Sequence, residues 1–268
     1  MIKKVKTMDF SKIEYKTNYL NQVIIRIDFL EFLNTTDIFC SDIEKTILRY
    51  FPRRGMSQAV YHNSLNFVIN EEGLRNQIGN RIEGIQKEYY TNDGANKIIL
   101  SNNFFIAEIN RYQSFSAHIG EIKYIIESIF NNNHVTAQRV GTRFINIFDT
   151  RRIKIQKNYF APEVSSILSF GEYKEKNNYY GLDITRAMNL VEYRALSMRL
   201  NFRYGVYNPS YPNKLIRNDF VLDYDCINEE PIDRYENIIQ ALNLEHEHIQ
   251  QLFEKSITDN LRKVLNNE

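Results

Sequence analysis

The sequence lacks most of the patterns that identify common enzyme classes. It has 10 glycines among 268 residues and contains neither a Gly-x-Gly-x-x-Gly nor a Walker-type loop, which argues against a phosphate cradle. Lys and Arg total 34 against 33 for Asp and Glu, so the basic excess that many nucleic-acid-binding proteins carry is missing. We therefore predict no cofactor, and no nucleic-acid binding driven by net charge.

Long apolar runs and cysteines are also scarce. No segment approaches the ~20 apolar residues of a membrane helix, and the longest apolar region, residues 22–33, is interrupted by three charges. The N-terminal MIKKVKTMDF has the charges of a signal peptide without its apolar core. Two cysteines, Cys40 and Cys226, fit a reduced compartment better than a disulfide-stapled fold. We expect a cytoplasmic protein with no membrane contact.

Hydrophobic periodicity predicts the order strand, helix, three strands, helix over residues 1–134. The predicted elements are a strand at 22–32, a helix at 41–51, strands at 59–69, 81–91 and 96–109, and a helix at 114–130. Ser41 and Glu44 fit a capping box at the first helix. Asp93-Gly94 is a hairpin-turn signal between two strands.

The same order is predicted over residues 135–268. It comprises a strand at 139–150, a short helix at 161–170, strands within 182–207 and at 218–227, and a helix from about 231 to the C-terminus, kinked at Asn243. Residues 182–195 fit either a strand or a helix, and we favour a strand. We predict an α+β fold of two similar strand-helix-three-strand-helix halves, 1–134 and 135–268, with antiparallel sheets and long packed helices, forming one compact unit.

Three blocks of sequence together resemble a bacterial family. They are the early strand VIIRIDF, a central Arg-x-Gly-x-Arg-aromatic-Ile-Asn block at 139–146, and a C-terminal helix with Leu-Phe-Glu-x-Ser-Ile-Thr-Asp at 252–259. The resemblance is to an uncharacterised family known as "sporadically distributed protein" and spans nearly the whole chain. Members commonly have Leu where this chain has Thr142.

This resemblance implies no reaction, cofactor or catalytic residue. It implies a scattered distribution among bacteria, which is typical of genes that move with mobile elements or defence islands. We therefore predict a non-catalytic interaction or regulatory component of a bacterial system, of antiphage-defence or toxin–antitoxin type. Its partner would be a protein encoded nearby.

The central strand is the leading candidate for a binding site. In a strand, Arg139, Gly141 and Arg143 share one face. Two guanidiniums around a glycine gap suit a phosphate or carboxylate. The alternative, which we favour, is that each arginine pairs with an acid such as Asp28 or Asp223 on a neighbouring strand.

Arg199 and Arg203 extend this candidate site. They share a strand face with each other, and Tyr204 follows in the same strand. If this strand lies near Arg139 and Arg143, the four arginines and the tyrosine would resemble a surface for single-stranded nucleic acid. An RNA- or DNA-binding protein, or a metal-independent RNA-processing enzyme, is therefore our alternative function. A solvated sheet face with scattered ion pairs is the simpler interpretation.

Other clusters give weaker signals. Ser256 and Asp259 lack a nearby base within their motif, so we expect Ser256 to pack against a neighbour and Asp259 to pair with Arg262 or a strand arginine. In EHEH, residues 245–248, the histidines are two apart and do not match a helical zinc site, so we expect a solvated charged face. Asp223 and Asp225 share a strand face and are expected to pair with arginines.

No candidate combines a nucleophile, a base and a metal set, so we lean away from an enzyme and predict no catalytic or metal-binding residue. The sequence does not fix the oligomeric state, and a homodimer is one alternative.

Overall fold

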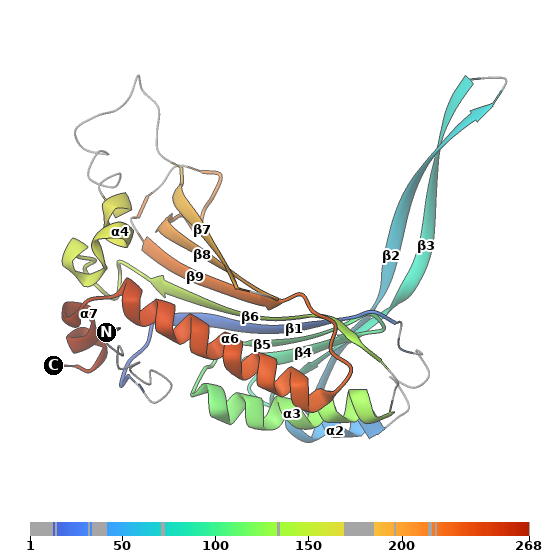
Figure 1. Ribbon diagram of the computed structural model, residues 1–268. Helices are drawn as coiled ribbons and strands as arrows, with labels where there is room; N and C mark the ends of the chain where they lie inside the picture. Colours follow the sequence, from blue (N-terminus) through green and yellow to red (C-terminus); the bar gives the residue numbers. More distant parts are fainter. Residues whose placement is uncertain are drawn as a thin grey trace, which may run out of the picture. The chain divides into compact units, whose positions relative to one another are not determined.

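The computed structural model describes residues 13, 15–31, 33, 42–70, 73–132, 135–168, 185–195, 197–213, 216–217 and 219–267, with only the backbone of 60–83 and 132 (Figure 1). The fold is α+β, as predicted, and is built on a large antiparallel sheet. None of the helices in these ranges is long and apolar enough to cross a bilayer.

The sheet has nine strands among the described residues. Hydrogen bonds join neighbours in the order β2-β3-β4-β5-β1-β6-β9-β8-β7. The strands are β1 (Leu20–Phe29), β2 (Arg53–Asn70), β3 (Gly73–Tyr90), β4 (Asn96–Ser101), β5 (Phe104–Ile109), β6 (Ala137–Phe148), β7 (Ala187–Ala195), β8 (Met198–Tyr207) and β9 (Asp219–Asn228). The strand prediction was therefore right for Ala187–Ala195, where a helix was the alternative.

The chain divides into two compact units. One comprises residues 1–23, 141–229 and 240–268, and the other comprises 24–140 and 230–239. We call them the C-terminal unit and the N-terminal unit. The boundaries fall inside β1, β6 and the helix α6 (Tyr235–Ser256), so these elements contribute to both. The predicted halves, 1–134 and 135–268, are defined by a repeated order of helices and strands, and not by compactness. They therefore stay a prediction.

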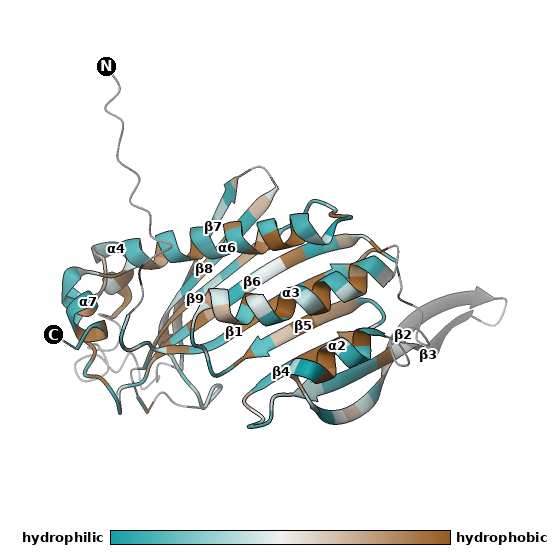
Figure 2. Cartoon of the chain, turned by 90° about the horizontal axis from the view of Figure 1, so that it is seen from below, coloured by the Kyte–Doolittle hydropathy of each residue, from teal (hydrophilic) through white to brown (hydrophobic). Residues whose placement is uncertain are grey.

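In the N-terminal unit, two helices lie side by side on one face of the strands (Figure 2). They are α2 (Asp42–Tyr50) and α3 (Phe115–Asn132). Their apolar residues recur every three or four positions, and Ile43, Ile47, Ile122, Ile126 and Ile129 are buried. Ser114 caps α3, because its hydroxyl accepts the amide of Ala117 at 3.2 Å. Ser41 lies outside the described residues.

Turns in this unit confirm one prediction and correct another. Gly94 has a φ of 74° in the turn between β3 and β4, as the Asp93-Gly94 signal requires. The run 96–109, predicted as one strand, instead forms β4 and β5, which pair antiparallel around Asn102-Asn103. The carbonyls of these two asparagines accept the amides of Leu33 and Phe29, so contacts distant in sequence hold the turn.

In the C-terminal unit, α6 runs across the strands β6 and β9 (Figure 1). The alternate residues Val140, Thr142, Phe144, Asn146 and Phe148 of β6 are buried, whereas the intervening positions from Arg143 onward are partly exposed. Short helical turns at Lys157–Tyr159, Pro162–Ser165 (α4) and Ser166–Leu168 follow β6. The predicted short helix is thus present but brief.

The C-terminal helix is interrupted, but not where the sequence predicted. α6 is continuous through Asn243 and ends at Ser256, and α7 covers Asp259–Leu265. Between them Ile257 forms a bridge with Phe160, which takes its backbone out of the helix. The buried Glu254 near the end of α6 accepts hydrogen bonds from Tyr15 at 2.7 Å and from Arg262 at 2.9 Å. This carboxylate therefore joins α7 to the N-terminal segment.

Candidate interaction surface

Two of the predicted arginines share one carboxylate. Arg143 on β6 donates from Nε and Nη2 to the two oxygens of Asp223 on β9, at 2.8 and 2.7 Å. Arg203 on β8 lies 3.4 Å from Asp223 and 3.5 Å from Asp225. Asp223 is only 5% exposed, and its hydrogen bonds raise the pKa of the Arg143 guanidinium. The expected pairing of Asp223 and Asp225 with arginines is confirmed.

The other two arginines have separate acidic partners. Arg139 Nε lies 3.3 Å from Asp28 on β1, which Arg26 also contacts. Arg199 lies 2.8 Å from Glu229 and 3.8 Å from Glu192. The structure thus brings Arg143 and Arg203 together but gives each of the four arginines a carboxylate, as the favoured alternative predicted.

Gly141 and Tyr204 lie in the interior. A Cβ at Gly141 would meet the carbonyl oxygen of Cys226 at 3.4 Å, so the neighbouring β9 backbone occupies the predicted gap. The Tyr204 ring is buried beside Phe202, and its hydroxyl donates to the Glu163 carbonyl at 3.3 Å. Neither residue presents the open surface that the sequence suggested, because Gly141 faces the backbone of β9 and Tyr204 is on the buried face of β8.

The prediction for EHEH was wrong, because Glu245 is fully buried and does not belong to a solvated face. Its Oε2 accepts the hydroxyl of Thr142 at 2.6 Å. Burial raises the pKa of Glu245 to about 8, which the Thr142 hydrogen bond partly offsets. Burial also lowers the pKa of His246, which lies against the Phe144 ring, to about 4. Both shifts favour the neutral form of the side chain near pH 7.

In the C-terminal motif, the expected pairing of Asp259 with Arg262 is present. Ser256 is buried and donates to the Leu252 carbonyl at 2.6 Å. Arg262 donates to Asp259 at 2.7 Å. Sequence reasoning missed Glu254 of this motif, which is buried and holds Arg262 and Tyr15. No cluster of three or more metal-ligating side chains occurs within the described ranges.

Strand β7 is the most open element of the C-terminal unit. It ends the strand order, and β8 is its strand neighbour. Most of its side chains are exposed, and among the large ones Leu190 is 63% and Tyr193 47% exposed. Leu190 lies opposite Arg203 and Tyr193 opposite Leu200, so the two exposed side chains are on different faces.

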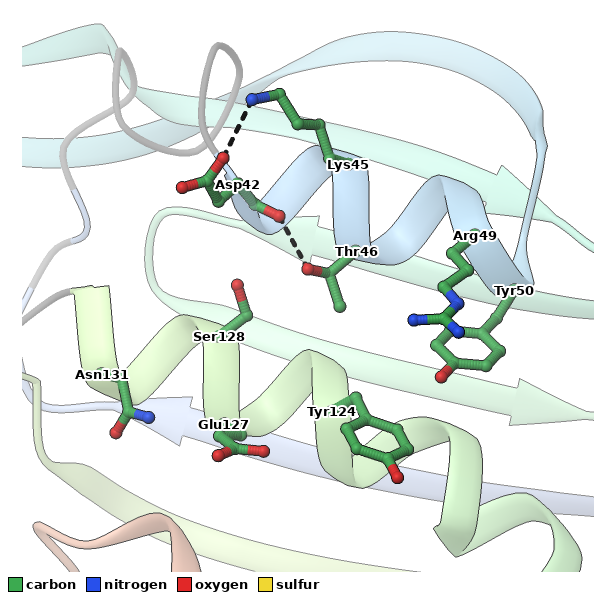
Figure 3. A pocket seen from close by; sticks show the side chains of 9 residues that line it. All are labelled: Asp42, Lys45, Thr46, Arg49, Tyr50, Tyr124, Glu127, Ser128 and Asn131. Carbon is green, nitrogen blue, oxygen red and sulfur yellow. Dashed lines mark hydrogen bonds and ion pairs between the residues drawn. The ribbon is translucent and has the colours of Figure 1, made fainter.

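A groove between α2 and α3 is a second open feature (Figure 3). It encloses about 550 Å³, and the rings of Tyr50 and Tyr124 stack at one end with centroids 6.1 Å apart. Asp42 already binds Lys45 at 2.9 Å and the Thr46 hydroxyl through its carbonyl at 2.7 Å. The lining mixes both charge signs and singles out no ligand.

Comparison with known proteins finds no matching family model and no matching curated protein.

Proposed function

We propose that this protein is a non-catalytic interaction component that binds a partner by adding one of the partner's segments as a strand along β7. The observation that carries the proposal is that β7 ends the sheet among the residues that the structure describes, with most of its side chains exposed. An edge strand presents a row of backbone N–H and C=O groups that another chain can pair with. Strand addition of this kind gives affinity through main-chain hydrogen bonds and specificity through alternate side chains.

The composition of β7 supports this proposal. Proteins usually protect an exposed edge with lysine, proline or a bulge. β7 reads AMNLVEYRA, without lysine or proline, and pairs with β8 in unbroken register from Ala187↔Val206 to Ala195↔Met198. Its charged side chains pair within the described sheet, Glu192 with Arg194 of β7 at 2.7 Å and with Arg199 of β8 at 3.8 Å. The edge is thus left suitable for a further strand.

A regulatory role in antiphage defence or a toxin–antitoxin system is the biological setting that we propose, from the family resemblance. A nucleic-acid-binding sheet face has less support, because the carboxylates of Asp28, Asp223 and Glu229 offset the charge of its arginines. We also propose that the two halves are related. β1 and β6 are neighbours, and each is flanked by the last strand of its own half, β5 or β9.

Hydrogen–deuterium exchange tests the interaction. The chain is co-expressed with the products of the adjacent genes, and exchange is compared in the free protein and in any complex obtained. We expect amides of Ala187–Ala195 to gain protection in the complex. A stable complex in which these amides exchange as fast as in the free protein would contradict the proposal.

A further inference from the structure

A small cavity lies directly beside β7, between the strands and α6. It encloses about 210 Å³, and its walls include Tyr193 of β7, Leu200 of β8, Cys226 of β9 and Leu252 of α6. Cavities that hold a drug-sized ligand usually enclose ~300–1,000 Å³. This cavity therefore suits a single side chain better than a whole small molecule.

The interior of the cavity is apolar and unreactive. Leu200 and Cys226 are buried there. Burial raises the pKa of the Cys226 thiol far above neutrality, so the sulfur is a neutral thiol and packs as a small apolar group. Covalent capture by Cys226 is therefore not expected, and the cavity offers an apolar contact.

The rim of the cavity has charge of one sign. The charged residues of the lining are Lys255 of α6 and Arg194 of β7, which Glu192 pairs at 2.7 Å, and none of the lining residues is acidic. Lys255 is exposed and has no ion pair among the residues that the structure describes. An occupant with carboxylates beside its apolar group would complement this rim.

The position of the cavity links it to the edge of the sheet. Tyr193 and Ala195 belong both to β7 and to the cavity wall. A strand added along β7 would lie ~4.8 Å away, with every second side chain on the same face as Tyr193. One such side chain would meet the mouth of the cavity.

We infer that the occupant is an extended, acidic segment of a partner protein, which pairs with β7 and inserts one aromatic or large aliphatic side chain into the cavity beside Lys255. This inference rests on the proposed function of β7 and adds the chemistry of the partner. A second copy of this chain is the competing occupant, because β7 itself carries Tyr193 next to Glu192.

Selection from a displayed library of random short peptides tests the inference. The full chain is the bait. A counter-selection against the variant Ala195→Trp, in which the larger side chain is designed to fill the cavity, removes peptides that bind elsewhere. We expect the retained peptides to be acidic around one aromatic or aliphatic residue. For the best of them, fluorescence anisotropy should show affinity falling about tenfold with Lys255→Glu and with alanine at the anchor position. Lys263→Glu, an equal charge change on α7, should leave affinity unchanged.

The outcomes separate the two proposals. The inference is overturned if the retained peptides lack acidic residues, or if no peptide depends on the cavity for binding. Protection of the β7 amides by a protein partner would in that case still support strand addition. A concentration-dependent dimer that protects β7 makes a second copy the occupant and also overturns the inference. Melting curves of each variant establish that a loss of affinity is not a loss of folding.

Discussion

The buried Glu245 and the half-buried His246 make stability depend on pH in two opposite directions. The pKa of Glu245 is raised from 4.5 to about 8, so the folded chain keeps a proton that the unfolded chain releases, and stability is lost as pH rises through this range. The pKa of His246 is lowered from 6.5 to about 4, so its contribution is lost as pH falls through that range. The two effects oppose each other below pH 6.5.

Of these two residues, only Glu245 makes the stability depend on pH between pH 6.5 and about 8. We expect the free energy of unfolding to fall across this window by at most about 1.4 kcal/mol per pH unit. Glu245→Gln should flatten this slope in urea unfolding measured at closely spaced pH values. Glu247→Gln, on the exposed side of the same helix, should leave it unchanged. Parallel slopes for wild type and Glu245→Gln would show that the carboxyl is already ionised.

A second residue-level prediction concerns Arg143. Arg143→Ala leaves the buried Asp223 with only the longer contact to Arg203, and should lower stability by about 1–3 kcal/mol. Arg151→Ala removes an exposed local pair with Asp149 and should cost much less stability than Arg143→Ala. Thermal melting of both variants measures the difference. Equal losses of stability in the two variants would show that the ion pair of the buried Asp223 stabilises the fold no more than an exposed pair does.

At the scale of elements, Gly205 determines whether β7 can lie against β8. Its φ is 153°, and a Cβ there would come within 2.1 Å of the Ala187 carbonyl oxygen. Gly205→Ala should therefore destabilise the chain by at least about 1–3 kcal/mol and speed amide exchange along β7. Gly120→Ala in α3, where no atom lies within 4 Å, should instead stabilise by about 0.5–1 kcal/mol. If the β7 amides of Gly205→Ala exchange as slowly as those of the wild type, Gly205 is not required for the pairing of β7 with β8.

Local periodicity was sufficient to predict most elements but not their interruptions. The turn at Asn102-Asn103 depends on the amides of Leu33 and Phe29, and the end of α6 depends on the bridge to Phe160. These partners are distant in sequence, so no local pattern reveals them. Glu245 is different: it falls on the stripe of Ile238, Leu242 and Ile249, and this spacing signalled its burial. Its partner Thr142, 103 residues away, had no such signal.

At the scale of the whole molecule, the sequence predicted the α+β class and the acidic partners of the arginines. The edge position of β7 and the cavity beside it were not predicted. Edge position depends on the order of strands, which is set by packing between segments far apart in the chain. The cavity requires side chains of β7, β8, β9 and α6 to meet. Neither property is encoded in any single stretch of residues.

The contact between Tyr15 and Glu254 gives a prediction at this scale. Tyr15→Phe removes a hydrogen bond to a buried carboxylate and should cost about 1–2 kcal/mol. It should also speed exchange of the Thr17 amide, which donates to the Leu265 carbonyl at 2.9 Å. Tyr124→Phe, at an exposed ring on α3, is the matched control. Unchanged protection of Thr17 would show that the segment is held without Tyr15.

The hydrogen bonds of Tyr15 and Thr17 can form only late in the synthesis of the chain. Tyr15 and Thr17 find their partners 239 and 248 residues later in the chain. At ribosomal rates of ~5–20 residues per second, the interval before Glu254 is made is roughly 12–50 seconds. During this time Tyr15 and Thr17 have left the ribosome without their C-terminal partners, whereas β5 and β6, the strand neighbours of β1, are already made. The N-terminal segment at Tyr15 and Thr17 is therefore expected to take its native position only after α7 has been made.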